Sequence, residues 1–243
     1  MKNGGQLRIS AKNLGSLALP GFCARCTWIG FHADKLPFQM PFPGIFSSID
    51  AYTKHSVEGW LEKTGDLPWW LQEIGKARAA RKVPPKEFRT EVDGVLLTGI
   101  PDSVLEMADG TFFILDYKTA RYTERQDALA SMYRVQLNGY ALIAEDRGMS
   151  PVTGLALVYF EPPATEVMRA EAVSKTTAEG FTMPFTPQVI RIGKHLEEIR
   201  VLAKKAKEIH DLPTPPEGRA GCENCRNVQG LFALLGNGSS PSV

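Results

Sequence analysis

Apolar and polar residues follow two different periods along the 243-residue chain, and each period predicts a different element. The β-branched and aromatic run 111–115 and the nearly continuous apolar run 152–160 are typical of buried strands. Over 48–63 and 124–146, apolar side chains recur at helical spacing, so we expect amphipathic helices there. Together these elements predict an α/β fold, in which helices flank a mixed sheet.

Weaker patterns complete the predicted secondary structure. We expect a strand over 88–98 with a bulge at Gly94, another strand over 165–174, and a long helix over 186–210. Three prolines, beginning with Pro213, end that helix.

Serines and prolines suggest the ends of other elements. Ser47 and Ser48 are the expected N-caps of the first helix, because their hydroxyls can accept free backbone N–H groups. We expect irregular structure over 1–20 and in the Pro-rich stretch 37–44, and a disordered tail over 236–243.

The stretch 99–118 is predicted to form a β-hairpin with an acidic residue near each outer end. An Asp-Gly pair supplies the turn. Because side chains alternate along a strand, Asp116 and Lys118 share one face. Asp102 joins that face only if the loop has an odd number of residues, such as 108–110, since a two-residue loop would separate the acids. We expect the odd loop.

Two carboxylates and an ammonium on one face suit metal-dependent hydrolysis of phosphodiesters. Mg²⁺ and Mn²⁺ prefer carboxylate oxygens, which Asp102 and Asp116 would supply, and such ions activate the attacking water. Lys118 would position that water or stabilise the developing charge. An ordinary charged surface hairpin is the alternative, because a D-x-K string often occurs by chance.

The pattern GIPD…LDYK resembles the PD-(D/E)XK nuclease superfamily. Gln136 and Tyr140, four positions apart on one helix face, and the upstream His55 narrow the resemblance to the RecB-like exonuclease branch. Asp116 stands where many members have Glu, but Asp is common in this branch. The resemblance implies a restriction-endonuclease-like sheet.

The resemblance also implies roles for individual residues. Gln136 and Tyr140 would contact the substrate or orient the lysine beside the active site. The metal would be held by one imidazole, two carboxylates and one backbone carbonyl, which belong to His55, Asp102, Asp116 and Tyr117.

All four cysteines lie in two C-x-x-C pairs near opposite ends of the chain, Cys23/Cys26 and Cys222/Cys225. The N-terminal sequence does not suggest secretion, so we interpret the pairs as metal ligands rather than as disulfides. Four thiolates suit either Zn²⁺ or a [4Fe-4S] cluster, and the spacing leaves both open. The site would join the segments 20–30 and 218–230.

The resemblance favours the iron–sulfur cluster. AddB-type and CRISPR-associated RecB-like nucleases hold a [4Fe-4S] cluster between N-terminal and C-terminal cysteines. That family usually has one cysteine before the nuclease core and three after it, whereas this chain has two and two. Cys26 would replace the third C-terminal ligand.

Composition limits the remaining functions. The formal net charge is +1, so any nucleic-acid binding depends on a local basic patch such as 76–89, which could equally be a solvated surface. No apolar run is long enough to span a membrane, and we expect a cytoplasmic protein. We predict a single domain with its nuclease core at about 45–210.

The combined prediction is a Mg²⁺- or Mn²⁺-dependent DNA exonuclease acting on single-stranded ends. Repair, recombination or CRISPR spacer processing would be its setting, with repair or CRISPR-adaptation proteins as partners. One alternative is a non-catalytic DNA-binding or scaffold subunit with the same fold. Another is a zinc-stapled endonuclease acting on duplex or flap DNA.

Overall fold

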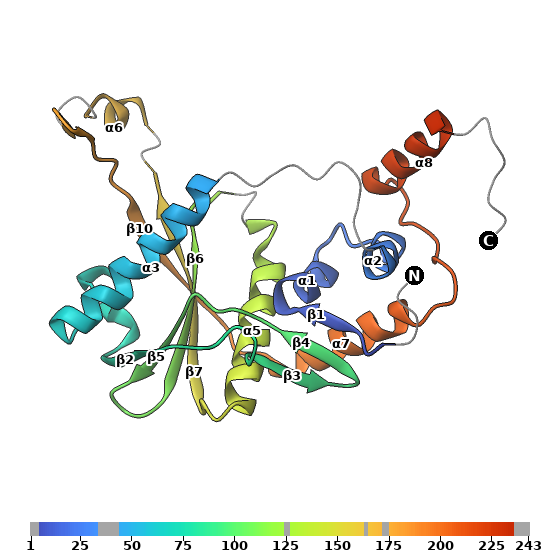
Figure 1. The fold of residues 1–243 in the computed structure, drawn as a ribbon, viewed down its shortest axis with the longest axis horizontal. Coiled ribbons are helices and arrows are strands. Elements are labelled where there is room, and N and C mark those ends of the chain that lie inside the picture. Colours follow the sequence, from blue (N-terminus) through green and yellow to red (C-terminus); the bar gives the residue numbers. More distant parts are fainter. Residues whose placement is uncertain (1–4, 34–43, 124–126, 163–164, 172–174, 236–243) are drawn as a thin grey trace.

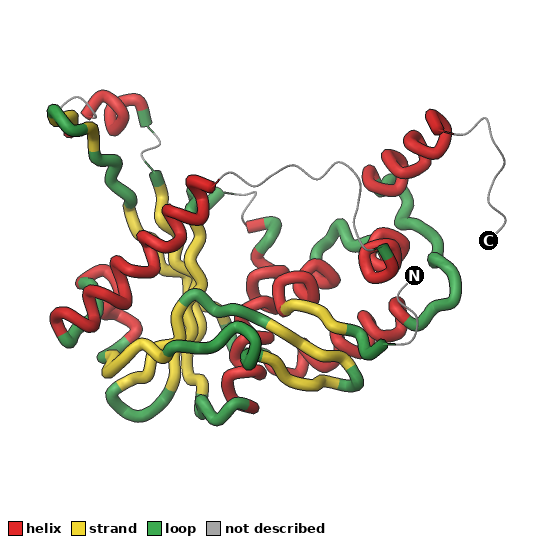
Figure 2. Tube along the Cα trace, viewed as in Figure 1, coloured by secondary structure: helices red, strands yellow, loops and turns green. Residues whose placement is uncertain are grey.

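The computed structural model describes residues 5–33, 44–123, 127–162, 165–171 and 175–235. At its centre is a mixed sheet with the strand order β10-β7-β6-β5-β2 (Figures 1 and 2). Its strands are β2 (Ala77–Arg81), β5 (Ser103–Met107), β6 (Phe112–Lys118), β7 (Val152–Glu161) and β10 (Thr186–Ile192). β6 and β7 run parallel and the other neighbours are antiparallel, which confirms the predicted α/β fold with a mixed sheet.

Helices cover both faces of this sheet. On one face, α3 (Gly44–Thr64) buries Val57 and Leu61 against β5 and β6. On the other face, α5 (Ala130–Asp146) connects β6 to the parallel strand β7, as a crossover of this kind requires. α7 (Leu196–His210) packs on α5 with its apolar face. The short helix η2 (Trp69–Ile74) follows α3.

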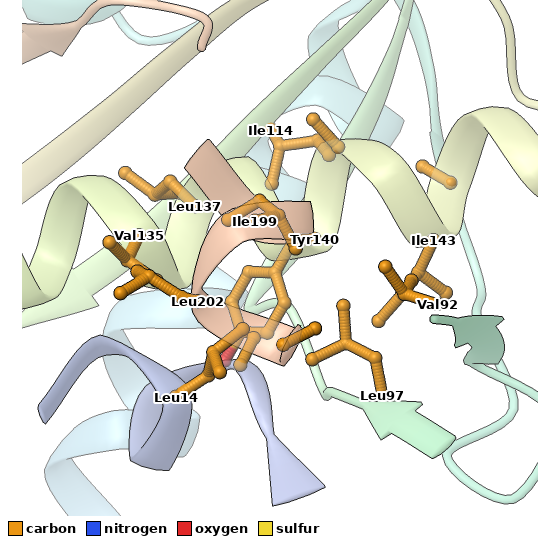
Figure 3. Packing of buried hydrophobic residues seen from close by; sticks show 14 of the residues in the cluster. Leu14, Val92, Leu97, Ile114, Val135, Leu137, Tyr140, Ile143, Ile199 and Leu202 are labelled. Atoms are coloured by element: carbon orange, nitrogen blue, oxygen red, sulfur yellow. The ribbon is translucent and has the colours of Figure 1, made fainter. Parts of the chain in front are cut away.

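A smaller sheet lies beside α5 and α7 (Figure 1). Its order is β1-β4-β3, with β1 (Arg8–Ser10), β3 (Arg89–Val92) and β4 (Val95–Thr98). Figure 3 shows Tyr140 of α5 in the core between this sheet and the helices, close to Leu14 and Leu97. The remaining elements are α1 (Ala11–Gly15), η1 (Ser16–Ala18), α2 (Ala24–His32), α6 (Glu166–Ala170), β8 (Thr176–Thr177), β9 (Gly180–Phe181) and α8 (Glu223–Leu235).

The predicted single strand over 88–98 is wrong. It is a hairpin of β3 and β4, which turns at Asp93 and Gly94. Both turn residues have positive φ, 49° and 78°, as the tight turns that join antiparallel strands require. The glycine therefore marks a turn rather than a bulge.

The predicted helix over 186–210 is also wrong in its first part. Residues 186–192 form the edge strand β10, and the helix begins only at Leu196. Ile190 and Ile192 pack against one core cluster while Val189 packs against the other, which is the alternation of a strand. Because these apolar residues sit close together, their pattern was open to either interpretation.

Two further elements differ from the prediction. The segment 165–174 holds the helix α6 rather than a strand, with 172–174 outside the described residues. α3 begins at Gly44, so Ser47 and Ser48 lie inside it, and the hydroxyl of Ser48 donates to the carbonyl of Gly44.

The N-terminal segment differs from its prediction, and several other predicted segments lie outside the described residues. Residues 1–20, predicted to be irregular, hold β1, α1 and η1. Most of the stretch 37–44 and the tail 236–243 lie outside the described residues, as do 124–126 of the predicted second helix. No helix in the described part of the chain is long and apolar enough to cross a bilayer.

Candidate active site

The β5–β6 hairpin brings Asp102 and Asp116 together. Ser103 pairs with Leu115, and the N–H of Met107 donates to the carbonyl of Thr111, so the loop is the three residues 108–110. This confirms the predicted odd loop. The same register places Asp102 opposite Asp116, and Asp102 Oδ2 accepts a 2.6 Å hydrogen bond from the backbone N–H of Tyr117.

Asp116 lies buried at the meeting point of β6 and α5. Its carboxylate forms an ion pair with Lys118. Its Oδ1 accepts a 3.0 Å hydrogen bond from the amide of Gln136, and that amide also donates to the Tyr140 hydroxyl at 2.8 Å. The ammonium of Lys118 lies 4.7 Å from the ring centre of Tyr133. The structure therefore brings together five of the predicted residues, namely Asp102, Asp116, Lys118, Gln136 and Tyr140.

The site is short of positive charge. Burial and the charge of Asp116 raise the pKa of Asp102 to about 7, although the Tyr117 N–H opposes this rise. Burial also raises the pKa of Asp116, against the opposing charge of Lys118. Two buried carboxylates whose ionised forms are disfavoured fit a hard divalent cation, which would stabilise both charges.

Asp50, exposed on α3, is a third acidic residue whose charge acts on the site, and the sequence did not predict it. Its charge contributes to the raised pKa of both Asp102 and Asp116, so α3 brings a third carboxylate close to the pair. The sequence feature that could have identified Asp50 is its position on a helix, three residues before the buried Thr53 and seven before the buried Val57, where an apolar residue is expected.

The structure places His55 on another side of α3. Five positions turn the helix by about 140° relative to Asp50, since each residue adds about 100°. His55 is exposed, and its ring lies against Gly59 of the same helix, where an added Cβ would come within 3.0 Å of it. Its role as a metal ligand stays a prediction.

A hydrogen-bonded chain ties α3 to the hairpin. The hydroxyl of Ser103 donates to Glu58 Oε1 at 2.6 Å and lies 2.9 Å from the hydroxyl of Tyr117. The Tyr117 side chain therefore points to the α3 face, while the neighbouring Asp116 points to the α5 face, as strand alternation requires. This link, also missed from the sequence, fixes the position of α3 relative to the carboxylates.

The basic stretch 76–89 is partly neutralised. Arg78 and Arg81 of β2 form ion pairs with Glu106 of the neighbouring strand β5. These contacts fit the interpretation of a charged surface.

The four cysteines meet, as predicted, beside α2 and α8. Every pair of their sulfurs lies within 4.8 Å, and three pairs are 3.5–3.6 Å apart. Burial alone would raise the pKa of Cys23, but backbone N–H groups, including that of Arg219 at 3.3 Å, lower it to about 6. A thiol that ionises readily is suited to metal ligation.

Comparison with known families agrees with this geometry. The family model of the PD-(D/E)XK nuclease superfamily matches residues 34–228. The chain belongs to this superfamily. Membership implies phosphodiester hydrolysis assisted by divalent metals, and a site with two carboxylates and a lysine is what such a nuclease needs.

Other comparisons add little to this assignment. No curated protein matches the chain. Among solved structures, the chain resembles that of SSO0001, with 12% identity, a TM-score of 0.40, and coverage of 98% of this chain and 88% of that chain. A likeness of that degree says nothing about activity.

Proposed function

We propose that this member of the PD-(D/E)XK superfamily is a Mg²⁺- or Mn²⁺-dependent deoxyribonuclease that degrades single-stranded DNA from its ends. The observation that carries the proposal is the placement of Asp102, Asp116 and Lys118 at one end of the β5–β6 hairpin. The hydrogen bond from Gln136 to Asp116, beside Tyr140, supports the RecB-like exonuclease resemblance. That resemblance suggests repair, recombination or CRISPR spacer processing as the setting.

Asp102 and Asp116 would hold the metal, together with the backbone carbonyl of Tyr117. A bound Mg²⁺ or Mn²⁺ supplies Lewis-acid stabilisation of phosphoryl oxygens and a more acidic bound water. The charge of Asp50 beside the pair makes it a better candidate than His55 for a further ligand, direct or through water.

Protein groups would do the rest of the chemistry. Lys118, in an ion pair with the buried Asp116, would present a positive charge where negative charge develops on the phosphate. The Gln136 amide fixes one oxygen of Asp116, so that the carboxylate keeps its orientation. Tyr140 in turn accepts a hydrogen bond from that amide and leaves its own proton for a substrate or a water.

The cysteine site would be structural. Four thiolates around one tetrahedral Zn²⁺, with Zn–S bonds of about 2.3 Å, lie about 3.8 Å apart. The observed spacings of 3.5–3.6 Å support a single ion. A four-iron cluster places a metal corner behind each thiolate and would hold the sulfurs farther apart. We therefore favour Zn²⁺ here over the [4Fe-4S] cluster that the resemblance suggests, and metal analysis of the purified protein distinguishes them.

The test of the function is cleavage of labelled single-stranded DNA by the wild-type protein and by Lys118→Ala. With Mn²⁺, we expect the wild type to shorten a linear end-labelled strand and to leave a closed circular strand intact. Lys118→Ala should lower the rate by at least about 10³-fold, because it loses the charge that stabilises the transition state. DNA binding in Ca²⁺ should remain.

Lys63→Ala is the matched control. Lys63 is an exposed lysine in the last turn of α3, about 20 Å along the helix axis from Asp50. Its substitution should leave the rate unchanged. Full activity of Lys118→Ala would refute the assignment, and binding without any cleavage by the wild type would favour the non-catalytic subunit. Cleavage of the circle would show an endonuclease.

A further inference from the structure

The N-terminal helix α1 lies outside the segment that matches the superfamily, which begins at residue 34. It nevertheless packs directly on α5, the helix that carries Gln136 and Tyr140. A Cβ added to Gly139 would come within 2.7 Å of the Ala11 Cβ, and a Cβ added to Gly15 would overlap the carbonyl oxygen of Met132. The two helices thus approach each other closely at both points, because one side of each contact is a glycine.

These two contacts place α1, and with it Lys12, over the face of α5 that carries Gln136. Along α5 they lie at residues 132 and 139, on either side of Gln136, whose amide donates to Asp116. Lys12 follows Ala11, which makes one of the contacts, and its own side chain is exposed.

The ammonium of Lys12 has no acid bound to it. Within the described residues it forms no ion pair and no hydrogen bond, whereas Lys118 is paired with Asp116. Lys12 therefore adds a solvent-accessible positive charge near the edge of a site whose other charges are mainly carboxylates. A compact ammonium at such a place suits one kind of ligand group, a phosphate oxygen.

We propose that Lys12 binds a phosphate of the DNA strand next to the one that is cleaved. The inference rests on the proposed nuclease function, and it adds a substrate contact from a helix that the family match does not cover. Because Lys12 is exposed and stands apart from the Asp116–Lys118 pair, it would hold the substrate and the transition state equally. Such a contact lowers KM without changing kcat.

The experiment compares wild type, Lys12→Met and Lys12→Arg on the same linear single-stranded DNA with Mn²⁺. We expect Lys12→Met to raise KM by about tenfold at unchanged kcat, and Lys12→Arg to restore most of the loss. In Lys12→Met, the dependence of KM on salt concentration should also weaken by about the amount that one phosphate contact contributes. A purely structural role would not produce this change. Lys63→Met, with the same charge lost from an exposed helical position, should match the wild type.

The possible outcomes separate this inference from the one on which it rests. If the wild type cleaves DNA and Lys12→Met has the wild-type KM and salt dependence, the Lys12 inference is wrong while the nuclease assignment stands. If Lys12→Met lowers Tm and kcat together and Lys12→Arg does not rescue KM, Lys12 is structural and the inference is again wrong. If the wild type does not cleave DNA, both fail.

Discussion

The carboxylate site and the cysteine site are built in opposite ways. Asp102 and Asp116 belong to one hairpin whose strands are buried in the main sheet. The cysteines come from segments about 200 positions apart. Cys26 lies in α2 and Cys225 in α8, and these two helices bury no side chain among those described. Cys23 and Cys222 themselves are buried.

This difference indicates what holds each site together. Apolar packing of the sheet fixes the hairpin, so the carboxylates are in place before any metal binds. The cysteine element has little apolar burial of its own, so ligation must offset the entropy of closing a loop of nearly 200 residues, on the order of 4–5 kcal/mol. The carboxylate site should therefore need metal for its chemistry, whereas the cysteine site should need metal for the stability of the fold.

The largest expected effect is a loss of stability when the cysteine site cannot bind metal. Cys222→Ala removes one thiolate, and we expect the protein to lose its tightly bound metal and about 10 °C in Tm, as the lost ligation energy predicts for a chain of this size. Metal analysis and thermal unfolding measure both changes. Below the new Tm, kcat with Mn²⁺ should stay within about tenfold of the wild type. A variant with normal Tm would show that α2 and α8 are held by other contacts.

Next in size is the effect of the third acid. Asp50→Asn should raise the Mn²⁺ concentration needed for half-maximal cleavage by about 10–100-fold, because a metal ligand or its close neighbour loses its charge. His55→Ala, on the same helix, should change it by less than about twofold. Titrating Mn²⁺ in the cleavage assay decides between them. The reverse ranking would restore His55 as the ligand.

A further effect concerns the stability of the protein at different pH in the absence of added divalent metal. The pKa of Asp102 is raised from 3.8 to about 7 in the folded protein, so the folded state binds the proton more tightly than the unfolded chain. That contribution to stability is fully present below about pH 4 and is lost as pH rises through 7. At pH 8, Asp102→Asn should therefore exceed the wild type in free energy of unfolding by on the order of 2–4 kcal/mol.

Urea unfolding between pH 5 and pH 8 measures this difference. Asp109→Asn is the matched control, because Asp109 lies exposed in the turn of the same hairpin and hydrogen bonds from Thr111 lower its pKa. Its substitution should leave the slope with pH unchanged over this range. If the free energy of unfolding changes equally with pH in Asp102→Asn and in the wild type, burial does not raise the pKa of Asp102 and the prediction is wrong.

Much of the candidate site could be predicted from local rules. Strand alternation alone placed Asp116 and Lys118 on one face, and Asp102 joined them only on the expectation of an odd loop, which local turn chemistry did not decide. The two C-x-x-C pairs predicted that the four cysteines come together, because four thiols in such pairs are typical of a metal site. The helical repeat placed Gln136 and Tyr140 on one helix face, and the family resemblance assigned them to the site.

The rest of the site depends on contacts between distant segments. Asp50 acts on the site because of how α3 lies across the sheet, and no spacing in the sequence gives that angle. The docking of α1 on α5 rests on small residues, Ala11 against Gly139, which leave no periodic signal. The strand β10 was mistaken for helix because its sheet partner β7 is about 30 positions away, and only the pairing decides.

The hairpin carboxylates should hold the catalytic metal. Anomalous diffraction from a crystal of the protein soaked in Mn²⁺, recorded near the manganese edge, locates that ion directly. We expect a Mn²⁺ peak within about 2.0–2.5 Å of carboxylate oxygens of Asp102 and Asp116, and its disappearance in Asp116→Asn. A Mn²⁺ ion bound only elsewhere, with the hairpin site unchanged, would contradict it.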